Sequence, residues 1–183
     1  MPINDIHLQL HRKTRAEAKL VDECWENLRN LLRQQLGTRL KLGKAGKLNV
    51  ELGSSETDHL RFTEVDGIGT LLRSDFDLDG YLNLSPAQQD QKALDYAVDS
   101  LKWLALRNDA DPRPVDMAAA AILASGFRFE KPLPKASAWN AARTLQARTF
   151  LCFRRGGGGV AVETRFFEGG GRGLGQETRI ADK

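Results

Sequence analysis

The chain has 183 residues, of which 41% are hydrophobic and 28% are charged. This length and composition suit one globular domain with a sizeable core, and they exclude collagen-like, low-complexity and wholly disordered proteins. The most apolar run, residues 117–124, is far shorter than the roughly 20 residues that cross a bilayer, and no signal-peptide pattern opens the sequence. Cys24 and Cys152 are too few for a disulfide scaffold. We therefore expect a cytoplasmic protein with reduced thiols and no membrane contact.

The net charge of +3 is unevenly distributed along the chain. Residues 1–50 carry ten Lys/Arg against five Asp/Glu, residues 51–116 carry six against fourteen, and residues 117–183 carry eleven against five. Such a distribution bears on partners and solubility rather than on fold. The acidic middle segment is therefore the first place to search for a binding surface.

Hydrophobic periodicity predicts strands and one long helix in the first third of the chain. Apolar and polar residues alternate over residues 6–12, as in a half-buried strand. Over residues 15–36 apolar side chains recur at helical spacing, and Gly37 follows where a helix C-cap is expected. Alternation then resumes around a glycine-containing turn, which predicts a hairpin over residues 40–52, and residues 59–65 predict a further strand.

The acidic middle segment predicts a second hairpin followed by a second long helix. Asp79 and Gly80 lie between short apolar runs over residues 71–84, and Asp-Gly is a common hairpin turn. Ser85 then resembles a helix N-cap, because proline follows at the first helical position and glutamine three residues after the serine. A helix is expected over residues 86–107.

The last third of the chain predicts a short helix, a hairpin and a tail. Residues 115–125 are rich in alanine, which indicates a short helix packed closely on its neighbours. Two strand-like runs, residues 149–155 and 160–167, flank four glycines and predict a long-looped hairpin. Residues 168–183 have too few large apolar side chains to offset the cost of ordering, so we expect a mobile tail there.

Together these elements predict an α+β fold. Strands interleaved with three helices, without a regular β-α-β rhythm, favour a mostly antiparallel sheet of hairpins packed with two long helices (about 15–36 and 86–107) and one short Ala-rich helix (about 115–125). A single globular domain is expected over residues 1–167, followed by the Gly-rich mobile tail over residues 168–183.

The acidic segment partly matches a calcium-binding loop. Asp75, Asp77 and Asp79 occupy positions one, three and five of such a loop, and a glycine follows at position six. Position twelve should supply a bidentate glutamate but is Pro86. Because the most informative ligand is missing, we interpret this segment as a plain acidic hairpin and predict no metal site.

No other motif indicates catalysis or a cofactor. His7 and His11 lie roughly 13 Å apart if they are on one strand, too far to share a metal ion, and His59 has no ligand-spaced neighbour. Cys24 lies on the apolar face of the first expected helix, where burial makes a thiol a poor nucleophile. The glycine-rich stretches match no phosphate-binding pattern. We predict no catalytic residues and no cofactor; an enzyme stays a third alternative, because active sites assemble from residues distant in sequence.

The outer face of the second long helix is the most informative feature. At 100° per residue the apolar side chains of this helix form one stripe, and two aromatic residues lie on the opposite side. Asp95, Asp99 and Arg107 lie on the same outer half. Either another layer of the domain covers these aromatic rings, or they form an exposed hot spot among carboxylates that faces a basic protein. The predicted partner-binding residues are Asp75, Asp77, Asp79, Tyr96, Asp99 and Trp103.

From this surface we expect a non-catalytic protein-binding module, specifically an immunity-type inhibitor in a bacterial cytoplasm that neutralises a basic cognate toxin by covering it. The alternative is a nucleic-acid-binding protein that uses the basic start of the first helix and the Arg/Gly-rich tail. We rank it second because the acidic middle segment would repel a polyanion. The basic residues in question are Arg12, Lys13, Arg15, Lys19, Arg154, Arg155, Arg172 and Arg179.

Overall fold

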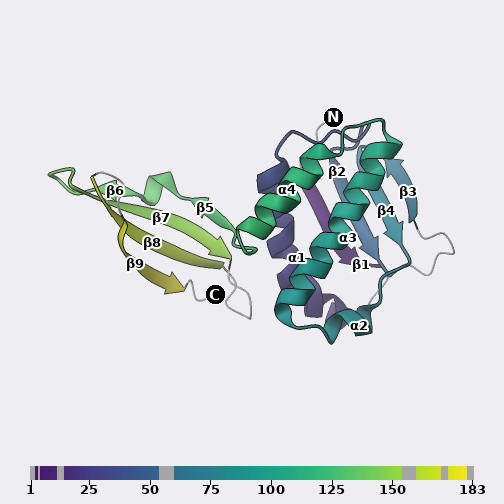
Figure 1. The fold of residues 1–183 in the computed structure, drawn as a ribbon, viewed down its shortest axis with the longest axis horizontal. Helices are drawn as coiled ribbons and strands as arrows, with labels where there is room; N and C mark the ends of the chain where they lie inside the picture. Colours follow the sequence, from purple (N-terminus) through teal and green to yellow (C-terminus); the bar gives the residue numbers. More distant parts are fainter. Residues whose placement is uncertain are drawn as a thin grey trace. The chain divides into compact units, whose positions relative to one another are not determined.

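The computed structural model describes residues 3, 5–11, 15–53, 60–153, 160–169 and 173–180. These residues form helices together with one mixed and one antiparallel sheet, so the predicted α+β class is confirmed. The chain divides into two compact units, Met1–Phe127 and Arg128–Lys183 (Figure 1). Among the described helices, none combines the length and the apolar character needed to cross a bilayer.

A four-stranded sheet forms one layer of the first unit. Strands β1 and β2 are parallel, β2 and β4 are parallel, and β3 is antiparallel to β4. The helix between β1 and β2 returns the chain to the same end of the sheet, which makes the parallel pairing possible. In spatial order the strands are β1 (Asp5–Leu10), β2 (Lys47–Leu52), β4 (Ile68–Arg73) and β3 (Leu60–Val65).

The hairpin expected over residues 40–52 is wrong. Leu42 and Ala45 form only an isolated bridge, and β2 lies between the parallel strands β1 and β4. Alternation predicted the strand correctly but carries no information about its partner. The predicted strand over residues 59–65 is confirmed as β3, and the turn after it uses Asp66 and Gly67 at φ 51° and 77°, the positive values that a tight hairpin turn of this kind requires.

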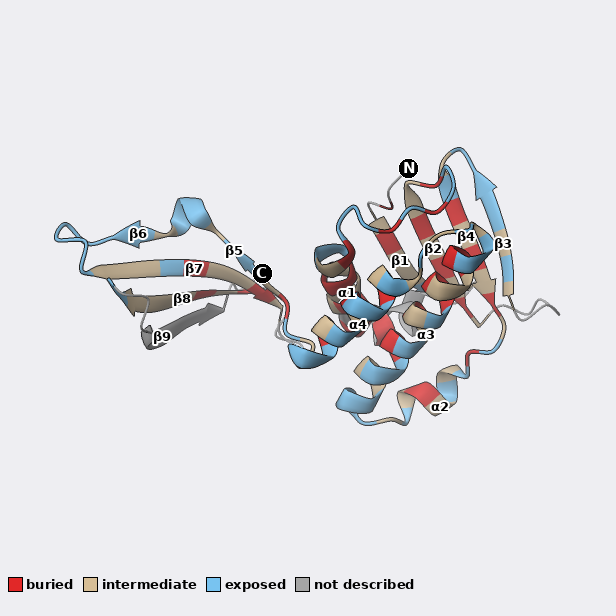
Figure 2. Cartoon of the chain, turned by 45° about the horizontal axis from the view of Figure 1, so that its top comes forward, coloured by how far each residue is buried: buried red, intermediate tan, exposed pale blue. Residues whose placement is uncertain are grey.

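The three predicted helices are confirmed nearly to the residue. They are α1 (Arg15–Leu36), α3 (Pro86–Arg107) and α4 (Arg113–Ala124). In α3 the capping box forms as expected: the side chain of Ser85 accepts from the backbone of Gln88, and the side chain of Gln88 accepts from the backbone amide of Ser85. Burial follows one side of α3 and alternates along β2 and β4 (Figure 2). Helix α1 packs on α3 and on β1, and α4 packs on both α1 and α3.

The expected hairpin over residues 71–84 is also wrong. Strand β4 ends at Arg73, and the chain enters a short helix, α2 (Leu78–Leu82), that contains both Asp79 and Gly80. Asp77 has extended backbone angles and its side chain accepts a hydrogen bond from the amide of Gly80, which makes it the N-cap of α2. An Asp-x-Asp-Gly segment suits a helix start as well as a hairpin, because aspartate is a favourable N-cap.

The second unit is an antiparallel sheet in the order β5-β7-β8-β9, with β6 paired to β7. The predicted hairpin around the four glycines is present as β7 and β8. Strand β9 pairs with β8 and lies within residues 168–183, where the sequence analysis expects a tail. The elements are β5 (Glu130–Pro132), a 3-10 turn η1 (Pro134–Ala136), β6 (Ala138–Trp139), β7 (Leu145–Phe153), β8 (Val160–Glu168) and β9 (Gly173–Ile180).

Candidate binding surface on α2 and α3

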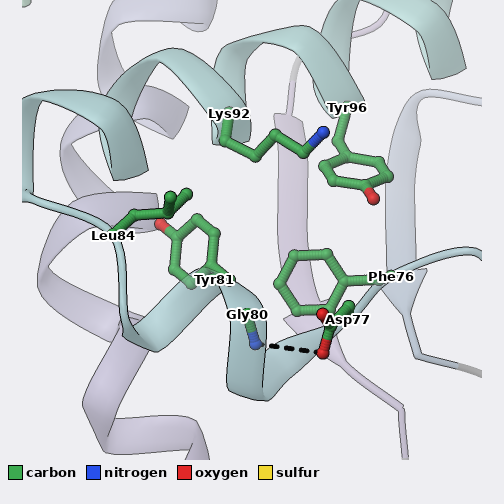
Figure 3. Close-up of a pocket in the computed structure, with 7 residues that line it drawn as sticks. All are labelled: Phe76, Asp77, Gly80, Tyr81, Leu84, Lys92 and Tyr96. Atoms are coloured by element: carbon green, nitrogen blue, oxygen red, sulfur yellow. Dashed lines mark hydrogen bonds between the residues drawn. The ribbon is translucent and has the colours of Figure 1, made fainter.

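A pocket of about 240 Å³ lies between α2, the segment before it and the first half of α3 (Figure 3). Its floor is aromatic: the ring of Phe76 packs against Tyr81 at 5.4 Å and edge-on against Tyr96 at 5.2 Å between centroids. Trp25 of α1 packs edge-on against Phe76 at 5.7 Å. The lining residues are Phe76, Asp77, Gly80, Tyr81, Leu84, Lys92 and Tyr96.

Buried polar contacts hold one wall of this pocket to α1 and α3. The indole nitrogen of Trp25 donates to the hydroxyl of Tyr81 over 3.1 Å, and this hydroxyl donates to the sulfur of Cys24 over 3.3 Å. The thiol of Cys24 in turn donates to Asp90 of α3 over 3.1 Å. Cys24 is therefore a buried, hydrogen-bonded member of the packing between α1, α2 and α3.

Arg73, at the end of β4, fixes the segment that leads to the pocket. Its buried guanidinium donates twice to the carboxylate of Asp75, over 2.9 and 2.6 Å, and also to the carbonyl of Tyr96 and the hydroxyl of Ser100. The hydroxyl of Tyr96 donates to the backbone carbonyl of Asp75 over 2.9 Å. These bonds attach the segment to α3, and they place a positive charge beside Asp75.

The structure therefore divides the predicted acidic residues into two kinds. Asp75 is paired with Arg73, and Asp77 caps α2, so two of the three carboxylates in the calcium-like pattern have protein partners. Asp79, in the first turn of α2, and Asp99, on α3, are both exposed. Asp77, whose carboxylate is also exposed, thus still offers its charge to a partner together with Asp79 and Asp99.

The predicted residues on α3 form one stripe along its outer side. Asp99 lies one turn from Tyr96 and one turn from Trp103, and both aromatic side chains are half-buried. Phe76 and Arg73 cover part of the Tyr96 ring. Burial raises the pKa of the Tyr96 hydroxyl, and the charges of Asp75, Asp77 and Asp99 raise it further. Three of the other five predicted residues therefore act electrostatically on this hydroxyl.

Trp103 lies two turns farther along α3 than Tyr96. The guanidinium of Arg107 lies 5.2 Å from the centre of its ring, a cation–π distance. Trp103 therefore extends the surface toward the carboxyl end of α3, where it is separate from the pocket.

Several residues of this surface were not predicted from the sequence. Arg73 lies in a strand and gave no signal of its burial, whereas Phe76 and Tyr81 were assigned to a hairpin. Lys92 offered a usable signal, since it precedes Tyr96 by four residues and so shares its side of the helix. Its ammonium lies 5.3 Å from the centre of the Tyr96 ring.

The histidines that the structure describes each contact a carboxylate. Nε2 of His7 lies 2.7 Å from Asp5, and Nδ1 of His11 lies 2.6 Å from Glu51 on the neighbouring strand. The two imidazoles thus form two separate pairs, and His59 lies outside the described residues.

A cluster of metal-ligand type occurs in the second unit, where donor atoms of Glu130, Cys152 and Glu163 lie within 4.8 Å of one another. Both carboxylates already accept hydrogen bonds from Arg165, and Arg128 also pairs with each. Burial, and then the nearby glutamates, raise the pKa of the Cys152 thiol. The cluster is therefore an ion-pair network in which guanidinium groups supply the positive charge.

Comparison with known proteins found no matching family model, no matching curated protein and no matching solved structure. A function must therefore be inferred from the geometry of the surface itself. The seven residues that line the pocket include three aromatic rings, one carboxylate and one ammonium, but no imidazole, thiol or hydroxyl nucleophile of serine or threonine. Ring faces beside one carboxylate and one ammonium can bind a charged side chain.

Proposed function

We propose that the protein is a non-catalytic protein-binding module, and specifically an immunity-type inhibitor that covers a basic cognate toxin in a bacterial cytoplasm. The observation that supports this proposal is the stripe on α3, in which half-buried Tyr96 and Trp103 flank the exposed carboxylate of Asp99. Aromatic anchors among polar neighbours are typical of interface hot spots.

Two further features support binding to a basic partner. The segment around Asp75 is held to α3 by Arg73 and Tyr96, so little ordering is needed when a partner docks. The exposed charges of Asp79 and Asp99 act over a Debye length of about 8 Å at physiological ionic strength, which is enough to orient an approaching basic surface.

The nucleic-acid alternative depends on residues that this structure does not test. Its basic residues lie outside the described residues or within helix and strand segments whose side chains are not described. Tight binding of DNA or RNA at physiological salt, lost in Arg12→Glu with Lys13→Glu, would favour that alternative over the present proposal.

The proposal is tested with the full chain as bait in an extract of its native host. A captured protein is purified, tested for toxicity and for inhibition by the full chain, and titrated calorimetrically. We expect Trp103→Ala to weaken its binding by about 2 kcal/mol or more, because a desolvated tryptophan anchor is lost, with little change in the free energy of unfolding.

Trp139→Ala is the matched control, because Trp139 is 48% exposed and lies on β6 of the other unit. It should leave binding unchanged. A loss of stability in Trp103→Ala with unaltered binding would show that this ring packs the domain and does not contact the partner. A captured protein whose activity the full chain does not inhibit would contradict the immunity role.

A further inference from the structure

We infer that the pocket beside Tyr96 binds an arginine side chain of the basic partner. This inference rests on the proposed function and adds to it the chemical group that the pocket recognises. It concerns the pocket on α2 and the first half of α3, whereas Trp103 lies outside it.

The Tyr96 ring already attracts cations of the protein itself. The guanidinium of Arg73 lies 4.8 Å from its centre and the ammonium of Lys92 lies 5.3 Å from it. Both distances fall within the roughly 6 Å over which an aromatic face attracts a positive charge. Two cations of the protein thus already lie against this ring.

Lys92 is held weakly against this ring. Its side chain is exposed, and Figure 3 shows it reaching across the rim of the pocket toward Tyr96. Among the described residues, its ammonium has a ring contact but neither an ion pair nor a hydrogen bond. Because the side chain has a long flexible stem and its ammonium is strongly hydrated, a cation from a partner can displace it at little cost.

The remaining walls of the pocket fit an arginine. Phe76, Tyr81 and Leu84 offer apolar surface for the methylene groups of the side chain, and the planar guanidinium stacks readily on an aromatic ring. One oxygen of the Asp77 carboxylate accepts from Gly80, and a carboxylate has further lone pairs for a guanidinium. The pocket thus combines apolar walls, the face of the Tyr96 ring and the negative charge of Asp77.

The local charge favours a cationic group over an anionic one. Asp75, Asp77 and Asp99 all lie close enough to influence the Tyr96 hydroxyl electrostatically, whereas the cations nearby are Arg73, already paired with Asp75, and the displaceable Lys92. An acidic side chain would bind only through Lys92 and against these carboxylates. Arginine is therefore the better match.

The test uses a blocked Gly-Arg-Gly peptide and its citrulline counterpart, which has nearly the same shape but no charge. Both are titrated into the full chain and followed by amide NMR shifts. We expect the arginine peptide to shift resonances of residues that line the pocket and to bind at least tenfold more tightly than the citrulline peptide.

Two variants locate the binding group. Lys92→Gln should bind the arginine peptide about two- to fivefold more tightly, because one exposed cation–π competitor is removed. Asp77→Asn should bind it several-fold more weakly, and asparagine keeps the helix cap intact. Lys102→Gln is the matched control: it removes the same charge from the same helix, but its ammonium pairs with Asp116 of α4. It should leave peptide binding unchanged.

Any one of three results would overturn the inference. The first is equal affinity for the arginine and citrulline peptides, and the second is an equal effect of Lys92→Gln and Lys102→Gln on the affinity for the arginine peptide. The third is a Gly-Glu-Gly peptide that binds more tightly than the arginine peptide and whose binding Lys92→Gln abolishes. These results would leave the proposed function standing if partner binding still depended on Trp103. Conversely, arginine-peptide binding without any captured partner would contradict the function and preserve the pocket assignment.

Discussion

Arg73 and Arg113 each pair with an aspartate two residues away, yet their surroundings differ greatly. The side chain of Arg73 is 7% exposed and donates hydrogen bonds to Asp75, Tyr96 and Ser100, whereas that of Arg113 is 83% exposed and pairs only with Asp111 among the described residues. A buried guanidinium with several partners organises its neighbourhood, while an exposed pair is screened by water. The same spacing of arginine and aspartate thus forms a buried hydrogen-bond network at Arg73 and an exposed ion pair at Arg113.

We expect Arg73→Met to lower the free energy of unfolding by about 3 kcal/mol, because the carboxylate of Asp75 loses both hydrogen bonds from the guanidinium and the carbonyl of Tyr96 loses one of its donors. Arg113→Met should cause no measurable loss. Urea denaturation of both variants and of the wild type checks this difference. Equal changes in the two variants would show that the Arg73 bonds do not hold the segment before α2.

At the scale of elements, an ion-pair network joins strands β5 and β8 across β7. Arg165 of β8 donates to Glu130 of β5 and to Glu163 of its own strand. The hydrogen bonds from Arg165 lower the pKa of Glu130, and the charge of Arg128 lowers it further. Strands β5 and β8, which both pair with β7, are therefore joined to each other by charges in addition to the backbone ladder.

This network predicts a dependence of stability on pH. Because the pKa of Glu130 in the folded state lies below its ordinary value of 4.5, the carboxylate stabilises the fold above about pH 4.5, and this contribution is lost as pH falls through the folded-state value. Glu130→Gln should therefore destabilise the full chain at pH 7 and much less at pH 3.

Thermal unfolding at the two pH values measures this effect, and Glu168→Gln serves as its control. Glu168 is exposed at the end of β8, so its variant should match the wild type at both pH values. A destabilisation by Glu130→Gln that is the same at pH 7 and pH 3 would show that packing, and not charge, accounts for its contribution.

At the scale of the whole molecule, the net charge of +3 is the sum of two units of opposite sign. Residues 1–127 carry sixteen Lys/Arg against nineteen Asp/Glu, and residues 128–183 carry eleven against five. The candidate binding surface lies on the acidic unit. Its field should therefore attract a basic partner even though the chain as a whole is basic.

We expect Asp79→Lys with Asp99→Lys to slow association with the captured partner about tenfold at low salt and to flatten the salt dependence of the rate. These two positions are preferable to Asp75, whose carboxylate already pairs with Arg73. Stopped-flow measurements over a range of salt concentrations give the rates. Glu168→Lys is the control on the other unit, and a comparable slowing there would point to net charge instead of this surface.

Local patterns of residues were enough to predict the helices and the aromatic, acidic outer face of α3. Helical spacing placed α1 and α3, alanine content placed α4, and the cap formed by Ser85 and Gln88 marked where α3 begins. The opposition of Tyr96 and Trp103 to the apolar stripe also followed from helix geometry. These features are local: each depends on residues within a few turns, so periodicity and capping suffice to predict them.

The pairing of the strands and the partners of the charged residues could not be predicted from local patterns. The parallel neighbours of β2, the burial of Arg73 beside α3 and the role of Asp77 as a helix cap depend on contacts between segments distant along the chain. An Asp-Gly segment is compatible with a turn or with a helix start. An arginine in a strand can point its guanidinium into water or pair it with a buried partner. In each case the packing of the folded chain selects one conformation, because a buried polar group needs a hydrogen-bond partner and only the observed conformation supplies one.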